Sequence, residues 1–338
     1  MHVILHGNIV QQVVDRERAG SFVKELVVTG GRVPLAMVRK RSVERQGDRG
    51  PVLLVHGFGQ NRYAWHLPAR SFANHLATAG FDVFNLDLRG HGRSRHFGAR
   101  RCRGVEDYVR EDLPDAVHEI QTLSGGRPAW VVGHSLGGLV GYAAAPSLAG
   151  AVSGVVSIGS PYHFTRGSFT LGALSYLVRA LSVAPLPNAA VPLFPVGATM
   201  RTIRRFAESP LYPFPLRGWH AGSCEPHVLN QHLRLAFDRA AIAETRDLFA
   251  WANERRFGGR DTDYVERFEA MDLPLFVIAG DKDDLAPPAS VQPGFAKSRS
   301  KDKTYRVLPF GHIDLLVGRD APATTWSLVE DWLVQRAA

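Results

Sequence analysis

The stretch VVGHSLGG, residues 131–138, decides how this chain folds. An apolar run at residues 129–132 ends abruptly at Gly133, and a run of small residues of helical character follows from Gly138. This change predicts a β-strand, a very tight turn and an α-helix, with Ser135 at the apex of the turn. Glycines two residues before and after Ser135 let strand and helix pass close together, so the serine can be held in a strained backbone conformation. The alternative is a glycine-rich turn that carries a serine by chance, because short motifs also arise at random.

The composition indicates a globular protein with a full hydrophobic core. Of the 338 residues, 45% are hydrophobic and 21% are charged, which allows one large α/β domain with an insertion or two modest domains. The net charge of +8 comes mostly from arginines that are scattered along the chain. No aromatic-interleaved basic stripe accompanies them, which argues against nucleic-acid binding and leaves some affinity for anionic surfaces.

The cysteines and the first residues of the sequence indicate the cellular compartment. Cys102 and Cys224 lie far apart, so neither a disulfide framework nor a metal site is expected, and a reducing compartment is the default. The chain start lacks the basic and apolar regions of a signal peptide, and no run of about 20 apolar residues predicts a membrane helix. We therefore expect a cytoplasmic protein, with peripheral contact to a lipid surface left open.

Strands and helices alternate along most of the sequence. Two antiparallel strands are predicted at residues 22–29 and 33–41. Further apolar runs predict strands at 51–56, 81–88, 129–132, 152–159, 273–279 and 303–308, and helical patterns lie at 68–79, 105–123, 138–145 and 323–334. Pro114 should kink or break the second of these helices. The alternation predicts a doubly wound, mostly parallel α/β sheet with right-handed crossovers.

Residues 161–272 interrupt this alternation. The segment is rich in proline and in apolar residues, and helical patterns recur at 226–238 and 240–253. Because a structureless loop of this length is implausible in a compact domain, we expect a helical cap inserted into the α/β core. The predicted division is a first core part at 1–160, the cap at 161–272 and a second core part at 273–338.

A serine hydroxyl becomes a nucleophile only when a base removes its proton and an anion orients that base. In a strand–turn–helix arrangement the acid and the histidine come from later loops at the same sheet edge. Asp281, Asp283 and Asp284 follow the strand at 273–279, and spacing alone does not choose among them. Carboxylates in such a turn are also common as plain turn formers.

His312 is the favoured base. It lies just beyond the strand at 303–308, one strand after the acidic turn, and therefore has the required place in the order serine, acid, histidine. Taken alone, it would be an ordinary loop histidine.

A tetrahedral intermediate also needs backbone N–H donors for its oxygen anion. One is expected from Leu136, which follows the serine at a helix start. The other is expected from Phe58, in the HGFG turn after the strand that ends at His56.

Together these residues resemble the α/β-hydrolase superfamily, in its serine-nucleophile branch, over nearly the whole chain. The landmarks occur in family order: HGFG at 56–59, DLRGHGRS at 87–94, GHSLG at 133–137, GDKDDLAP at 280–287 and GH at 311–312. The family pattern G-x-x-D-x-x-x-P matches Gly280, Asp283 and Pro287. The resemblance therefore implies Asp283 as the acid, with Asp281 or Asp284 as the fallback.

Within the superfamily, residues 65–95 and 108–114 are similar to the acid-lipase branch, and residues 311–313 to polyhydroxyalkanoate synthases. Those polymerases use a cysteine where this chain has Ser135, and epoxide hydrolases and haloalkane dehalogenases use an aspartate. The resemblance thus implies a Ser–His–Asp hydrolase that cleaves small-molecule carboxylic esters, with a sizeable apolar acyl group, through an acyl-enzyme.

Other functions remain open on the same residues: a thioesterase, a C–C bond hydrolase, an acyltransferase or a non-catalytic relative that binds through the fold. No organic cofactor or metal is expected, because the sequence has neither zinc-ligand spacing nor a dinucleotide-binding loop.

Overall fold

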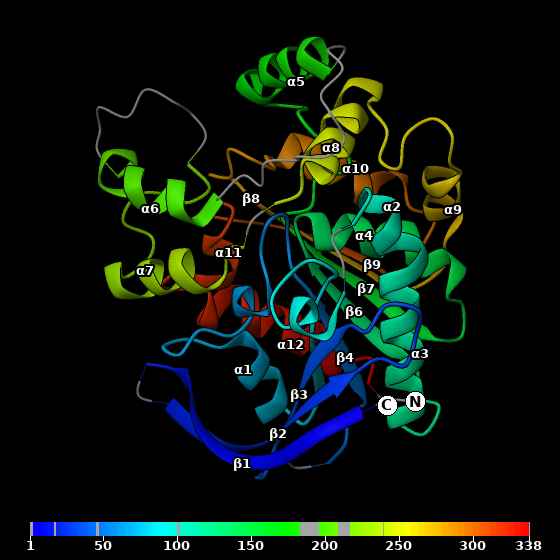
Figure 1. The fold of residues 1–338 in the computed structure, drawn as a ribbon, viewed down its shortest axis with the longest axis vertical. Helices are drawn as coiled ribbons and strands as arrows, with labels where there is room; N and C mark the ends of the chain where they lie inside the picture. Colours follow the sequence, from blue (N-terminus) through cyan, green and yellow to red (C-terminus); the bar gives the residue numbers. More distant parts are fainter. Residues whose placement is uncertain are drawn as a thin grey trace.

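A nine-stranded sheet forms the centre of the molecule (Figure 1). The computed structural model describes residues 3–16, 18–44, 47–99, 102–182, 196–208, 217–238 and 240–337. The strands follow the spatial order β1-β2-β3-β5-β4-β6-β7-β8-β9. Their bounds are β1 Val3–Asp15, β2 Arg18–Val28, β3 Ala36–Ser42, β4 Pro51–Val55, β5 Asp82–Asp87, β6 Ala129–His134, β7 Val152–Ile158, β8 Leu275–Gly280 and β9 Lys303–Leu308.

The sheet has an antiparallel edge and a parallel body. β1, β2, β3 and β5 pair antiparallel, whereas every pairing from β5 and β4 through to β9 is parallel. This confirms the predicted fold class of a mostly parallel α/β sheet. β1 was not predicted from the sequence, and it extends the antiparallel edge by one long strand.

Helices cover both faces of the parallel body because successive strand residues point to opposite faces. In β4, Val52 and Leu54 belong to one apolar core, which includes residues of α1 (Phe72–Thr78), α7 (Pro226–Leu235), α11 (Asp314–Val317) and α12 (Ser327–Val334). Leu53 and Val55 belong to the other, with α3 (Leu113–Leu123), α4 (Leu136–Ala144), α9 (Tyr264–Ala270) and α10 (Pro288–Lys297). The parallel strands are buried on both sides, as their continuous apolar runs predict.

The helix expected at 105–123 changes its winding before Pro114. It begins as α2 (Val105–Asp107), widens into the π-helical turn η3 (Tyr108–Asp112) and continues as α3, in whose first turn Pro114 lies. Proline lacks the N–H group that a continuing helix would use, and the hydrogen-bond pattern changes in the wider π-turn directly before it. The winding of the helix therefore changes next to Pro114, while a kink or a break there stays a prediction.

Five helices lie between β7 and β8 in the described ranges: α5 (Phe169–Ser182), α6 (Val196–Ala207), α7, α8 (Ile242–Glu254) and α9. α5 packs against α8, and α6 packs against α7 (Figure 1). Parts of the expected cap, at 183–195, 209–216 and 239, lie outside the described residues. The three-part division of the chain stays a prediction. None of the helices in the described ranges is long and apolar enough to cross a membrane.

One buried arginine joins three distant parts of the chain. The Arg70 side chain donates hydrogen bonds to Asp15 at the end of β1 (2.7 Å) and to both carboxylate oxygens of Glu225 (2.9 Å each). It also donates to the carbonyl oxygens of Val317 (2.9 Å) and Gly318 (3.0 Å). Only 2% of Arg70 is exposed, so these contacts replace nearly all of its hydration.

The close contact between β4 and the start of α4 generates a stability prediction. A Cβ added at Gly137 would lie 2.2 Å from the carbonyl oxygen of Val55, whereas one added at Gly141 would meet only side-chain methyls at 3.5 Å. We expect Gly137→Ala to lower the free energy of unfolding by about 3 kcal/mol or more, because backbone must move. Gly141→Ala should be neutral or slightly stabilising, since alanine favours helix. Urea unfolding of both variants measures this, and equal stability would contradict the close contact.

Candidate active site

Ser135 occupies a strained turn between β6 and α4. Its φ of 54° and ψ of −120° place a non-glycine residue in a region that L-residues rarely adopt. Its backbone N–H donates to the carbonyl oxygen of Ile158 (2.9 Å), which fixes the turn to the end of β7. The local geometry is that of a serine held at the apex of a strand–turn–helix unit, at the carboxyl end of the parallel sheet.

Asp283 and His312 lie in direct contact although 29 residues separate them. His312 Nδ1 donates to Asp283 Oδ2 at 2.7 Å, and both side chains are buried. The loops after β8 and β9 are joined by backbone hydrogen bonds from Asp281 to Leu308 (2.9 Å) and from Lys282 to Phe310 (3.1 Å). Asp281 itself is exposed to solvent.

The other oxygen of Asp283 is held by the backbone. Oδ1 accepts hydrogen bonds from the N–H groups of Leu285 (2.8 Å) and Ala286 (2.7 Å). These donors orient the carboxylate, so that its second oxygen faces the His312 ring. Asp284 next to it is half-buried, and its pKa is raised by burial and then by the Asp283 charge.

Ser135 and His312 line one cavity of about 340 Å³. Its wall is mainly apolar and comes from the core loops and from helices α5, α6, α7 and α8. Representative apolar residues are Leu139, Phe164, Leu171, Met200, Leu248 and Phe249. A pocket of this size and character suits a small ligand with an extended hydrocarbon part.

Phe58 and Leu136, the two expected backbone donors, also line this cavity. Within the described ranges neither of their N–H groups has a hydrogen-bond acceptor in the protein. Leu136 is the first residue of α4, so the partial positive charge of that helix start lies at the cavity. Both groups are thus available to a ligand oxygen.

Two buried side chains that the sequence analysis missed hold the histidine loop. His134 Nε2 donates to the carbonyl oxygen of His312 (3.1 Å), and the two rings lie 4.6 Å apart between centroids. Burial, and next the neighbouring His312, hold the pKa of His134 well below its usual value, so its ring is neutral. Asp314 Oδ2 accepts from the N–H groups of Gly311 (3.0 Å) and His220 (2.6 Å). The position of His134 directly before the serine was the one available signal.

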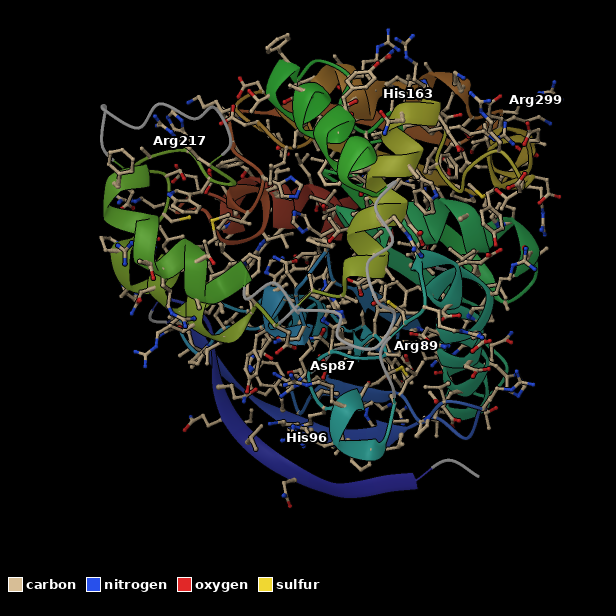
Figure 2. The ribbon with its side chains drawn as sticks, turned by 45° about the horizontal axis from the view of Figure 1, so that its top comes forward. Asp87, Arg89, His96, His163, Arg217 and Arg299 are labelled. Atoms are coloured by element: carbon tan, nitrogen blue, oxygen red, sulfur yellow. The ribbon has the colours of Figure 1, made fainter. Side chains whose placement is uncertain are left out.

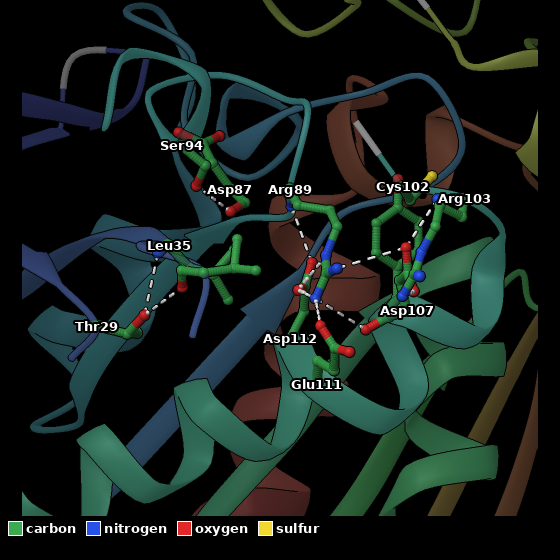
Figure 3. Close-up of polar contacts among 12 residues, drawn as sticks. Thr29, Leu35, Asp87, Arg89, Ser94, Cys102, Arg103, Asp107, Glu111 and Asp112 are labelled. Atoms are coloured by element: carbon green, nitrogen blue, oxygen red, sulfur yellow. Dashed lines mark hydrogen bonds and ion pairs between the residues drawn. The ribbon is translucent and has the colours of Figure 1, made fainter. Parts of the chain in front are cut away.

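The loop beside Phe58 is fixed by a buried arginine (Figure 3). Arg89 donates to Asp112 Oδ1 from Nε (2.7 Å) and to Glu111 Oε2 (2.7 Å), and its backbone N–H donates to Asp112 Oδ2 (2.9 Å). Burial raises the pKa of Asp112 to about 6, against the opposing effect of Arg89. His56 Nε2 accepts from the Leu88 N–H (3.1 Å), which joins the same loop to the turn that carries Phe58.

A second buried carboxylate connects α8 to the core. Glu244 Oε1 accepts from His91 Nε2 (3.1 Å), from Cys102 Sγ (3.2 Å) and from the Tyr108 hydroxyl. Burial acts to lower the pKa of His91, but the hydrogen bond and charge of Glu244 outweigh it and raise that pKa. The cavity wall formed by α8 is therefore held by a buried polar contact. In the described part of the chain, no group of three or more His, Cys, Asp or Glu side chains is placed to hold a metal ion.

Fold and site together define an α/β protein with a serine at a sheet-edge turn and a histidine–carboxylate pair on the same cavity. A family model described as alpha/beta hydrolase fold matches residues 50–319, so the chain belongs to this family. This confirms the superfamily that the sequence landmarks indicated.

Individual relatives include lipases and a polymerase. A monoacylglycerol lipase from Mycolicibacterium smegmatis is 28% identical over 269 residues, covering 77% of this chain and 80% of that protein. A poly(3-hydroxyalkanoate) polymerase subunit from Haloferax mediterranei is 23% identical over 359 residues, covering 96% of this chain and 69% of that protein. The lipase relative and the family match support hydrolase activity for this chain.

Solved structures show the same fold. A Paleococcus ferrophilus monoacylglycerol lipase has a TM-score of 0.56 at 21% identity, covering 89% of this chain and 99% of that chain. A soluble variant of a Saccharomyces cerevisiae monoglyceride lipase, in complex with a substrate analogue, has a TM-score of 0.58 at 17% identity and covers 90% and 93%. At these identities the likeness concerns the fold alone.

His232, a buried histidine behind the cavity wall, generates a pH prediction. It lies in α7, with its Nε2 atom 3.4 Å from Gln60 Nε2. Burial lowers the pKa of His232 from 6.5 to about 3. The unfolded chain therefore takes up a proton as the pH falls below 6.5 while the folded protein does not, so stability is lost on acidification. By about pH 4.5 this one group should cost about 3 kcal/mol of unfolding free energy.

Between pH 7 and about pH 4.5 we expect the unfolding free energy of His232→Gln to fall less than that of the unchanged protein. The difference should be about 3 kcal/mol, the contribution of the missing histidine. His227→Gln, an exposed position in the same helix, serves as the control. Urea titrations at the two pH values measure the difference. Parallel losses in all three proteins would mean that His232 does not contribute to acid sensitivity.

Proposed function

We propose that this protein is a serine hydrolase that cleaves small-molecule carboxylic esters with a sizeable apolar acyl group. One observation supports the proposal most directly. Ser135, in its strained turn, lines the same apolar cavity as His312, and His312 is hydrogen-bonded to Asp283. The names of the relatives, which include lipases and esterases, point in the same direction.

In the proposed reaction His312 takes the proton of Ser135 as the serine oxygen attacks the ester carbonyl carbon. Asp283 accepts a hydrogen bond from Nδ1, so the proton-accepting nitrogen of the ring is Nε2. The same carboxylate stabilises the imidazolium that forms. The imidazolium then protonates the leaving alcohol, which leaves an acyl group on Ser135. Water activated by His312 attacks this acyl-enzyme, and the acid departs with the enzyme restored.

The tetrahedral intermediates carry negative charge on the former carbonyl oxygen. We assign its stabilisation to the N–H groups of Phe58 and Leu136. Both residues line the cavity, and neither N–H group has a protein acceptor in the described ranges. Donors that are already oriented need no reorganisation during the reaction, which makes such groups effective. Removing one donor of this type costs about 3 kcal/mol of barrier in comparable sites.

The helices between β7 and β8 would act as a cap in this proposal. Residues of α5, α6, α7 and α8 supply much of the apolar cavity wall. An acyl chain lying against them would be removed from water, and the reacting carbonyl would lie in a site of low dielectric constant. The apolar wall thus favours an ester with a hydrocarbon acyl chain over a small polar one.

Acyl transfer to an acceptor other than water is the second candidate. Relatives by name include a polymerase subunit and a Saccharomyces cerevisiae probable alcohol acetyltransferase, 33% identical over 116 residues. Both chemistries would use the same serine, so product analysis separates them: hydrolysis releases the free acid, whereas transfer makes a new ester.

The first test is a panel of nitrophenyl esters from acetyl to palmitoyl, with the matching acyl-CoA thioesters. We expect kcat/KM to rise by up to about fourfold for each methylene that the cavity buries. Ser135→Ala should abolish turnover and labelling by a fluorophosphonate probe, while Ser153→Ala, at a surface strand position, should change neither. If no ester is hydrolysed, or thioesters are clearly preferred, the ester assignment is wrong.

The second test concerns the acid. Asp283→Asn should lower kcat by about 10³–10⁴-fold, because an amide disturbs the orientation and charge of the His312 partner. Asp281→Asn is the matched control two residues away, and its exposed side chain should leave kcat unchanged. Steady-state kinetics on one nitrophenyl ester suffice. A large loss in Asp281→Asn with none in Asp283→Asn would move the role to Asp281.

A further inference from the structure

A second cavity lies behind the wall of the candidate active site. This hollow, of about 450 Å³, is formed by residues 61–63, by residues 92–97 and by Asp238. Most of its charged and polar lining comes from basic side chains: Arg62, Arg93, Arg95 and His96. Asp87 and His96, at the two ends of one of its loops, lie in the lower half of the view in Figure 2. The proposed ester chemistry uses none of these side chains.

The two cavities share one thin wall. Gln60 and Phe237 form an antiparallel bridge, and both line the cavity of the candidate active site. Their neighbours Asn61 and Asp238 line the hollow instead, as expected when successive residues of extended chain point to opposite sides. Backbone hydrogen bonds from Asn61 to Ala236 (2.9 Å) and from Asp238 to Gly59 (2.8 Å) hold the wall together.

Two carboxylates near the hollow are already satisfied by other groups. Asp87 is fully buried, and it accepts from Arg62 Nη1 (2.6 Å) and from the backbone N–H groups of Arg62 and Arg93 (2.8 Å each). Asp238 Oδ2 accepts from the Gly92 N–H (2.7 Å), and its Oδ1 lies 3.4 Å from the half-exposed Arg95 guanidinium. Each carboxylate thus compensates one arginine.

One arginine that lines the hollow has no carboxylate partner. The Arg93 side chain makes no hydrogen bond or ion pair to another described residue. Lys24 does not line the hollow, but burial, and then the charges of Arg93 and Arg62, lower its pKa, so these cations act on one another. Like charges held together raise the free energy of the folded protein, and a bound anion would lower it.

We propose that this hollow binds a phosphate group, with the Arg93 guanidinium as its direct partner. A guanidinium presents paired N–H donors that match phosphate oxygens. Arg62, Arg93 and Arg95 stand against the two carboxylates Asp87 and Asp238, so the hollow has a positive surplus that an anionic phosphate would compensate. The phosphate is free, or belongs to a small molecule or to a lipid headgroup, and the position is separate from the ester-binding cavity.

The test is calorimetric titration with inorganic phosphate and pyrophosphate, at constant ionic strength set by chloride. We expect saturable binding to the unchanged protein and a loss of about tenfold in affinity in Arg93→Gln, because one charge-assisted contact disappears. Lys24→Gln should weaken binding by a smaller factor. Arg306→Gln removes the same charge from an exposed position on β9, at the opposite edge of the sheet, and should bind as the unchanged protein does.

A second arm identifies the source of the phosphate. Co-sedimentation with phosphatidylcholine vesicles that contain phosphatidic acid should depend on Arg93 only if a lipid headgroup is the ligand. If the unchanged protein binds neither the free anions nor these vesicles, or if Arg93→Gln and Arg306→Gln bind alike, the proposal is wrong. Thermal unfolding confirms that Arg93→Gln is folded, which keeps this test independent of the proposed ester chemistry.

Discussion

The close approach of α4 to the end of β4 is the constraint on which the rest of the site depends. Gly137 lies so near the carbonyl oxygens of Val55 and His56 that no side chain fits between them. This contact directs the start of α4 toward the sheet edge and leaves Ser135, between β6 and α4, with a positive φ. The backbone conformation of the serine is therefore set by packing of main chain against main chain.

Parallel register then brings the remaining groups together. β6, β7, β8 and β9 are neighbours that run in the same direction, so the loops that follow them leave the sheet at one edge. Asp283 and His312 follow adjacent strands and need no long reach to meet. Backbone donors hold one oxygen of the carboxylate, and His134 and Asp314 hold the histidine loop from the sides. The pair is oriented before any ligand arrives.

The parallel strands could be predicted from the sequence because a strand buried on both faces is a continuous apolar run. Asp283 could be named only through the family pattern, since three carboxylates share that turn and only folding decides which is buried. His134 and Asp314 could not be assigned roles, because their partners are backbone groups far away in the chain. β1 was missed because its interior mixes polar and apolar residues, and its ladder to β2 contains irregular register. The helices at 169–182, 196–207 and 264–270 were likewise not predicted within the expected insertion.

Arg70 has a consequence for the cooperativity of unfolding. Its partners lie at residues 15, 225 and 317–318, so this buried cation couples three segments that are far apart in the chain. Detaching any one of these segments would leave a buried charge with only part of its compensation, which costs free energy. The end of β1 is therefore coupled to the segments at 225 and 317–318, and the three detach together rather than fraying one by one.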